Sequence, residues 1–147
     1  MMQNPDWQDL ARRMVGMAPW FAAIGGELVM ARAGQAKARI SWREDLIGDP
    51  QTGVIHGGVI TSLLDQLCGA AVMSALNQPS PIATLDLRID YLKPAAKGMA
   101  IVGEAECLKV THEIAFVRGS AHNEADQEVI ALCTAAFMLT RPEGRTT

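Results

Sequence analysis

The sequence predicts an α+β domain in which one antiparallel sheet wraps around a single long helix. The stretch 59–76 is apolar nearly all round a helix, so a helix there needs cover on most sides. The segments after it alternate with period two and are joined by short turns, which makes neighbouring strands antiparallel. At 147 residues, 49% hydrophobic and without a break in composition, the chain suits one domain over 1–147.

The elements follow in order along the chain. Apolar residues at three- and four-residue spacing predict a short amphipathic helix over 5–17, which Pro19 ends. Strands are expected over 21–31, with a bend at Gly25-Gly26, and over 36–43, before a loop at 44–55. The long helix ends near 76, and strands are expected over 82–92, 99–110, 114–122 and 128–140. The core therefore spans about 20–140, and a short tail covers 141–147.

Composition excludes several classes of function. A net charge of −3 and 5% aromatic residues argue against a nucleic-acid partner. Polar residues interrupt the stretch 59–76, which argues against a membrane span, and the N-terminus lacks the apolar centre of a signal peptide. Cys68, Cys107 and Cys133 each lie in apolar sequence, which predicts buried free thiols in a reducing compartment. We therefore expect a cytoplasmic protein.

One carboxylate lies in the middle of the predicted core helix. Asp65 is the only charged residue between His56 and Asp86, and a buried unpaired carboxylate is costly. It is either a core residue satisfied by the backbone, Ser62 or Gln66, or a catalytic carboxylate made more basic by its surroundings. The residues alone support the two interpretations about equally.

The start of the same helix has two glycines and no Ser, Thr, Asp or Asn as a cap. His56-Gly57-Gly58 therefore predicts free backbone N–H groups at the positive end of the helix dipole, suited to an oxyanion. A tight turn with water on these groups is the alternative. Gly58 and Asp65 are seven residues apart, or about 10.5 Å of helix rise. Because both groups must lie within about 3 Å of one acyl carbon, a shared substrate requires them to come from two copies of the chain.

Two segments resemble a known family. The segment TGVIHGGVITSLLD, from Thr52 to Asp65, resembles the G-x-x-H-G-G-x-x-x-x-L-x-D signature of hotdog-fold acyl-CoA thioesterases. The segment TLDLRIDYLKPA, from Thr84 to Ala95, is similar to the strand that follows in that family, and the phenylacetate-degradation subgroup is the most similar. The resemblance covers about residues 36 to 140. It implies a dimer, often a tetramer, that hydrolyses coenzyme A thioesters to a free acid and CoA without a cofactor or metal.

The resemblance also implies roles for particular residues. Asp65 would be the nucleophile or the base that activates water, and Thr84 would hold that water. The N–H of Gly58, with that of Gly57, would polarise the thioester carbonyl, and His56 would shape the turn beside it.

Further substrate contacts are expected outside the signature. Family members often carry Asn-Pro ahead of it, whereas this chain has Asp49-Pro50-Gln51; Gln51 takes the role of the Asn, because an amide can donate a hydrogen bond to a carbonyl. Leu64 is a candidate for contact with the acyl group. The candidates for the CoA phosphates are Lys93, Lys97, Arg118 and Arg141.

Two other functions remain open on sequence alone. One is a non-catalytic acyl-CoA binding module, which would need no Asp65. The other is a hotdog hydratase or dehydratase, which would pair His56 with Asp65 across subunits. The sequence has no G-x-S-x-G, G-x-G-x-x-G or Walker motif. An aryl-acetyl, short or medium acyl group would suit the predicted pocket.

Overall fold

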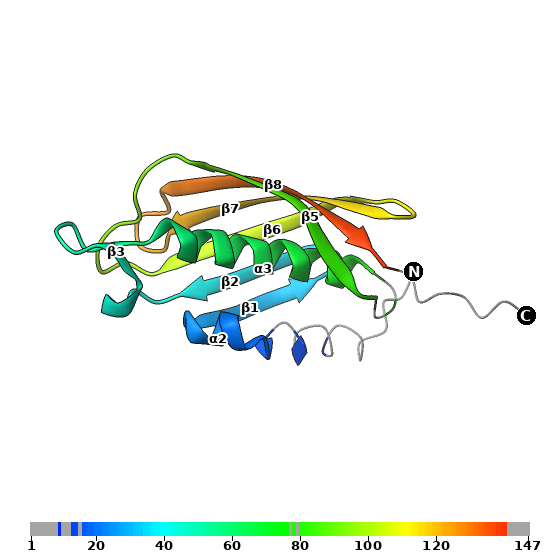
Figure 1. Ribbon diagram of the computed structural model, residues 1–147, viewed down its shortest axis with the longest axis horizontal. Coiled ribbons are helices and arrows are strands. Elements are labelled where there is room, and N and C mark those ends of the chain that lie inside the picture. Colours follow the sequence, from blue (N-terminus) through cyan, green and yellow to red (C-terminus); the bar gives the residue numbers. More distant parts are fainter. Residues whose placement is uncertain (1–8, 10–12, 15, 77, 79, 141–147) are drawn as a thin grey trace, which may run out of the picture.

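The computed structural model describes residues 9, 13–14, 16–76, 78 and 80–140. A six-stranded antiparallel sheet packs on one long helix, α3 (Gly57–Ala75), which runs across it (Figure 1). The strand order is β1 (Gly26–Arg32), β2 (Gln35–Ile40), β6 (Ile101–Val110), β7 (Ile114–Asn123), β8 (Val129–Leu139) and β5 (Ile82–Tyr91). A short helix, α2 (Pro19–Ala23), precedes β1, and a 3-10 turn (Glu44–Leu46) leads to a hairpin of β3 (Ile47–Asp49) and β4 (Val54–Ile55). The predicted fold class is confirmed.

Two stretches differ from the prediction. Pro19 begins α2 instead of ending a helix, because its fixed φ and missing N–H suit the first helical position. The strand predicted over 21–31 therefore starts only at Gly26. The loop predicted over 44–55 contains the β3–β4 hairpin. The helix predicted over 5–17 lies mostly outside the described residues, and the tail 141–147 lies wholly outside them.

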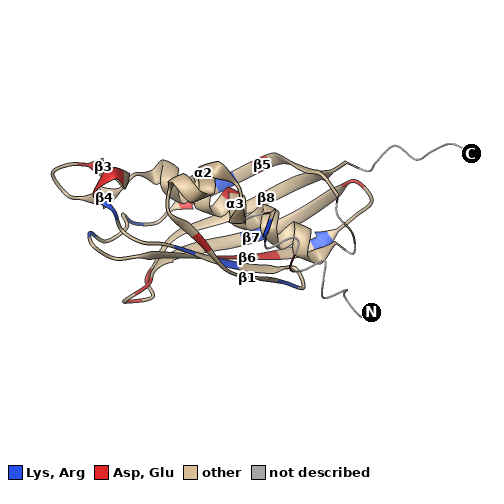
Figure 2. Ribbon diagram, turned by 90° about the horizontal axis from the view of Figure 1, so that it is seen from below, with Lys and Arg blue, Asp and Glu red and all other residues tan. Residues whose placement is uncertain are grey.

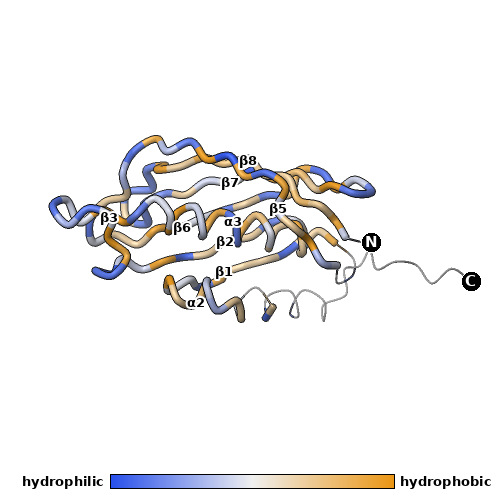
Figure 3. Tube along the Cα trace, in the orientation of Figure 1, coloured by the Kyte–Doolittle hydropathy of each residue, from blue (hydrophilic) through white to orange (hydrophobic). Residues whose placement is uncertain are grey.

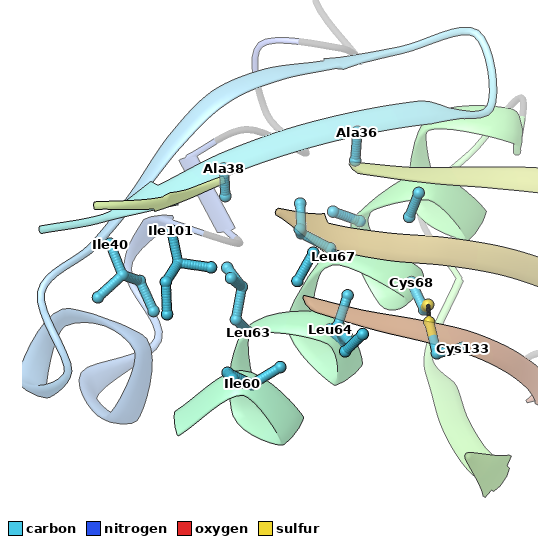
Figure 4. Close-up of a cluster of buried hydrophobic side chains, with 14 of the residues drawn as sticks. Ala36, Ala38, Ile40, Ile60, Leu63, Leu64, Leu67, Cys68, Ile101 and Cys133 are labelled. Carbon is cyan, nitrogen blue, oxygen red and sulfur yellow. Dashed lines mark hydrogen bonds between the residues drawn. The ribbon is translucent and has the colours of Figure 1, made fainter. Parts of the chain in front are cut away.

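The core forms between the buried side of α3 and one face of the sheet. The long strands change between hydrophilic and hydrophobic residues along their length (Figure 3), as expected for strands with one covered face. Ile60 and the leucines of α3 meet small residues such as Ala36 and Ala38 of β2 (Figure 4). A Cβ at Gly103 of β6 would lie 2.4 Å from Leu67 Cδ1, so glycine there allows the helix to approach the sheet closely.

The opposite side of α3 is not covered to the same extent. Thr61, Ser62, Asp65, Gln66 and Gly69 are half-buried, whereas their helical neighbours toward the sheet are fully buried. Asp65 lies in the middle of the core helix, as expected, but its side chain is half-buried and not fully buried. By length and composition alone, α3 is long and apolar enough to cross a membrane. One side of α3 is buried against the sheet, as in the core helix of a folded domain.

Strand β5 forms one edge of the sheet. All ten of its residues are half-buried or exposed, and among the described strands it pairs only with β8. Leu85, for example, is 52% exposed. A long edge with unpaired backbone groups is a template for pairing with another chain.

All three cysteines are free thiols, as predicted. Cys68 of α3 and Cys133 of β8 are buried and face each other with their sulfur atoms 3.7 Å apart (Figure 4). Cys107 is only half-buried, which corrects the prediction that all three are buried. The hydrogen bond with Cys133, together with burial, raises the pKa of Cys68. Cys68 is therefore a poor nucleophile.

Candidate active site on the open side of the central helix

Asp65 and Thr84 form the polar centre of the site. α3 carries Asp65 on its open side, and the first half of β5 carries Thr84, whose Oγ1 donates a hydrogen bond to Asp65 Oδ1 at 2.9 Å. None of the described Lys or Arg side chains forms an ion pair with Asp65. The carboxylate is thus half-buried and held by a neutral hydroxyl, with lone pairs left for a water molecule or a substrate. The structure brings together these two predicted residues.

A cavity of about 210 Å³ adjoins this pair. Asp65, Gln66 and Thr84 line it at one end. Gly69 and Met73 from α3, Ile82 from β5 and Phe137 from β8 continue it with apolar surface. A few polar groups beside an apolar lining are typical of a binding site for a small molecule.

The start of α3 differs from the prediction in one respect. His56 is the N-cap of the helix, and its Nδ1 accepts a hydrogen bond from the Gly58 N–H at 2.8 Å. The prediction that no side chain caps this helix is therefore wrong, because an unprotonated imidazole nitrogen can accept as a hydroxyl does. The Gly58 N–H is engaged. With Nδ1 as the acceptor, the neutral ring carries its hydrogen on Nε2.

Gly57 keeps an open donor at the same turn. Its N–H has no hydrogen-bond partner among the described residues. Its carbonyl, in contrast, accepts from the Tyr91 hydroxyl at 2.8 Å and from Thr61 Oγ1 at 3.2 Å, and the two hydroxyl oxygens lie 2.5 Å apart. Tyr91, at the end of β5, thus fixes this peptide from the sheet side. Sequence reasoning did not identify Tyr91 or Thr61.

The loop before the helix holds Asp49 and Gln51. Asp49 Oδ1 accepts from the Gln51 backbone N–H and Oδ2 accepts from Thr52 Oγ1, both at 2.9 Å. These hydrogen bonds hold the pKa of Asp49 below its usual value. Asp49 therefore organises the β3–β4 turn, while the side chain of Gln51 is exposed in it. A role for Gln51 at the substrate stays a prediction.

The candidate phosphate-binding cations lie in different places. Lys97 stacks its stem on the turn just before α3: a Cβ at Gly53 would lie 2.7 Å from Lys97 Cδ. It has no ion-pair partner among the described residues. Lys93 forms an ion pair with Glu128. Arg141 lies outside the described residues. Figure 2 shows acidic residues gathered around β3, at the end of the molecule that holds the turn at Gly53.

Arg118 and Leu64 are not near the open side of α3. Arg118 projects from the face of β7 that is opposite to the face of the buried Val117. Its Nη2 forms an ion pair with Glu106 Oε2 at 2.8 Å. With Lys37, it lines a hollow of about 360 Å³ on the outer face of the sheet. This hollow is larger than the cavity at Asp65, but the sheet separates the two and ion pairs occupy its charges. Leu64 has no exposed surface and lies in the core. Its contact with the acyl group stays a prediction.

No group of three or more His, Cys, Asp or Glu in the described part of the chain is arranged to hold a metal ion. A carboxylate, a hydroxyl and a helix N-terminus are sufficient for hydrolysis of an activated acyl group when all three reach the same acyl carbon.

Comparison with known proteins agrees with this chemistry. Residues 52–130, which include the helix start, Asp65 and Thr84, match the thioesterase superfamily. The medium/long-chain acyl-CoA thioesterase YigI of Salmonella typhimurium is 31% identical over 134 residues, with 82% of this chain and 85% of that protein covered.

Two solved structures have the same architecture. A protein from Pseudomonas aeruginosa has a TM-score of 0.79 and 35% identity, with 90% of this chain and 98% of that chain covered. A putative thioesterase from Ralstonia eutropha, described as related to phenylacetic acid degradation, has a TM-score of 0.73 and 25% identity, with 87% of this chain and 98% of that chain covered.

Proposed function

Because the chain belongs to the thioesterase superfamily, we propose that it hydrolyses acyl-coenzyme A thioesters at sites that are each built from two copies of the chain. The observation that carries the proposal is the hydrogen-bonded pair of Asp65 and Thr84 at the mouth of an apolar cavity. A binding module would need the cavity but not the carboxylate. A hydratase would need a second acid or base, and the Nδ1 of His56 is occupied by the helix cap.

Asp65 supplies the attacking group. It either attacks the thioester carbonyl itself or takes a proton from a water that does so. Thr84 Oγ1 orients one carboxylate oxygen, which leaves the other to face the acyl carbon or the water. When water attacks, loss of the CoA thiolate gives the free acid directly. When Asp65 attacks, loss of the thiolate leaves an acyl-Asp65 anhydride, which a water molecule then hydrolyses to the free acid and the Asp65 carboxylate.

Gly57 supplies the oxyanion donor. Its N–H is open at the positive end of α3, whereas the Gly58 N–H is bonded to His56. Tyr91 and Thr61 hold the Gly57 carbonyl and so fix the position of this turn. The thioester carbonyl would accept from Gly57, and the Nε2–H of His56 would be a second donor. Preorganised donors of this kind stabilise the tetrahedral intermediate.

Strand β5 supports the shared site. Thr84 lies beside Asp65 near the start of β5, and Tyr91 lies beside Gly57 at its end. If two copies pair their β5 edges antiparallel about a twofold axis near Leu87, the start of one strand meets the end of the other. Asp65 of one copy then approaches Gly57 of the partner subunit. Within one copy the two residues are separated by about 12 Å of helix rise.

The proposal extends to the cellular environment, the nucleotide site and the oligomeric state. The free, mostly buried thiols support a reducing compartment, and we place the protein in the cytoplasm. Lys97, exposed and without an ion pair among the described side chains, lies close to the helix start and is the candidate for a CoA phosphate. A homodimer is the minimum active unit, and two dimers would make a tetramer.

Thiol release from acyl-CoA substrates tests the chemistry. We expect the wild type to release CoA and Asp65→Asn to be slower by about 10²-fold or more, the scale for loss of a positioned base. Gly57→Pro removes the single open N–H, and its backbone is compatible because proline suits the first helical position and His56 has φ −58° and ψ 135°. It should lose about 10²–10³-fold in kcat. Gly57→Ala, which keeps the N–H, is the matched comparison.

Mixing the two inactive variants tests the shared site. Unfolding and refolding Asp65→Asn together with Gly57→Pro gives mixed dimers, in which one of the two sites has both groups intact. Equal mixing should restore about a quarter of the wild-type rate, since half of the dimers are mixed and each has one working site. No recovery, with mixed dimers demonstrated by mass spectrometry, would show that each site lies within one chain. Absence of thiol release by the wild type would overturn the thioesterase function itself.

A further inference from the structure

Gly69 is a glycine in the interior of a helix with no structural requirement for one. It lies in the fourth turn of α3, and glycine in a helix interior is less stable than alanine. Its φ is not positive, so an L side chain fits the backbone. An added Cβ would make only ordinary contacts, 3.6 Å from Phe137 Cε1 and 3.7 Å from Ile82 Cδ1. Neither the backbone nor the packing explains this residue.

The cavity beside Asp65 does explain it. Gly69 lies one helical turn after Asp65 on the same side of α3, and both line the 210 Å³ cavity. Phe137 and Ile82 form the wall that Gly69 faces. A larger side chain at 69 would project into the space between that wall and the helix. The missing side chain therefore keeps the apolar end of the cavity open.

We infer that Gly69 sets the length of the acyl chain that the enzyme accepts, with the chain running from Asp65 along α3 toward Met73. The inference rests on the proposed thioesterase function and names the part of its substrate that this cavity receives. The cavity volume of about 210 Å³ holds about seven non-hydrogen atoms if each takes about 30 Å³, the volume of a water molecule in the liquid. That corresponds to a medium-length acyl chain or a phenylacetyl group.

Side chains of increasing size at position 69 test the inference. Each methylene that is excluded from an apolar site lowers the relative rate about fourfold. Gly69→Ala should therefore lower the ratio of kcat/KM for octanoyl-CoA to that for acetyl-CoA about fourfold. Gly69→Leu, which fills the space of about three methylenes, should lower the same ratio about 60-fold. The matched control is Gly16→Ala: Gly16 is also helical, but an added Cβ there meets no heavy atom within 4 Å.

Thermal unfolding separates a role in specificity from a role in folding. Gly69→Ala should raise Tm by about 2–4 °C, because it removes a helix-interior glycine, while it narrows the chain-length range. A lower Tm would show that the fold needs this glycine and would overturn the inference. The same octanoyl-to-acetyl ratio in wild type, Gly69→Ala and Gly69→Leu would overturn it as well. Failure of the proposed function is distinct, since the wild type would then release no thiol from either substrate.

Discussion

Replacing Thr84 by valine removes one hydrogen bond and almost nothing else. The two side chains have the same shape, and valine is well suited to a strand. Only the Oγ1 hydrogen bond to Asp65 Oδ1, 2.9 Å long, is lost. If Thr84 orients the catalytic carboxylate, Thr84→Val should slow thioester hydrolysis and leave the fold intact.

The magnitude follows from the type of hydrogen bond. A hydrogen bond to a charged group contributes about 1.5–3 kcal/mol, and the exposed position of Thr84 favours the lower figure. About 1.5 kcal/mol corresponds to a loss of roughly tenfold in kcat/KM. The carboxylate itself remains, so the loss should be much smaller than that of Asp65→Asn. Steady-state thiol release measures both variants under the same conditions.

Thr84→Ser is the control, because it keeps the hydroxyl and removes only a methyl group. It should retain activity within about threefold of the wild type, and Tm should change by no more than about 2 °C in either variant. Wild-type activity in Thr84→Val would refute an orienting role for this residue. An equal loss in Thr84→Ser would assign the effect to the methyl group and so to packing.

Three further predictions concern the loop, the helix cap and the thiols. His56→Ala should lower Tm by about 2–4 °C through loss of the cap on the Gly58 N–H, whereas His56→Asn, which can cap, should not; equal Tm values would contradict the cap. The lowered pKa of Asp49 means that its contribution to stability is present above its unfolded value, about 3.9, and is lost as the pH falls through the folded value. The Tm advantage of the wild type over Asp49→Asn should therefore decrease as the pH falls below about 4, and it should stay constant above about pH 5. A thiol reagent should modify the half-buried Cys107 before Cys68 and Cys133, as peptide mapping would show.

The long elements could be predicted because their patterns extend over many residues. α3 is apolar over five turns, and the strands β6, β7 and β8 alternate over ten residues or more with short turns between them. α2 and the β3–β4 hairpin are too short for such patterns. The hairpin also makes contacts that a local pattern does not reveal. One of them is the hydrogen bond from Trp42 Nε1 to the Gly53 carbonyl, between residues that are 11 positions apart in the sequence.

The site was predicted in part for the same reason. Asp65 and the helix start follow from residue types at fixed spacing, and Thr84 follows from the resemblance to a family, whereas Tyr91 could not be found from alternation. Thr84 and Tyr91 are seven residues apart, so a regular strand would place them on opposite faces. A register shift between Thr84 and Asp86 reverses the alternation. Both side chains consequently reach α3.

Three incomplete features of the chain lie on the side of the molecule that β5 and the open side of α3 share. The outer edge of β5 pairs with no described strand. The polar strip of α3, formed by Thr61, Ser62, Asp65 and Gln66, is only half-buried. The Gly57 N–H has no acceptor among the described residues. An unrelated protein that covered the strip would also close the cavity beside Asp65. A second copy paired through β5 would instead complete the sheet, and it would bring the open donor of one helix to the carboxylate of the other. The substrate carbonyl would then be the acceptor that the Gly57 N–H lacks.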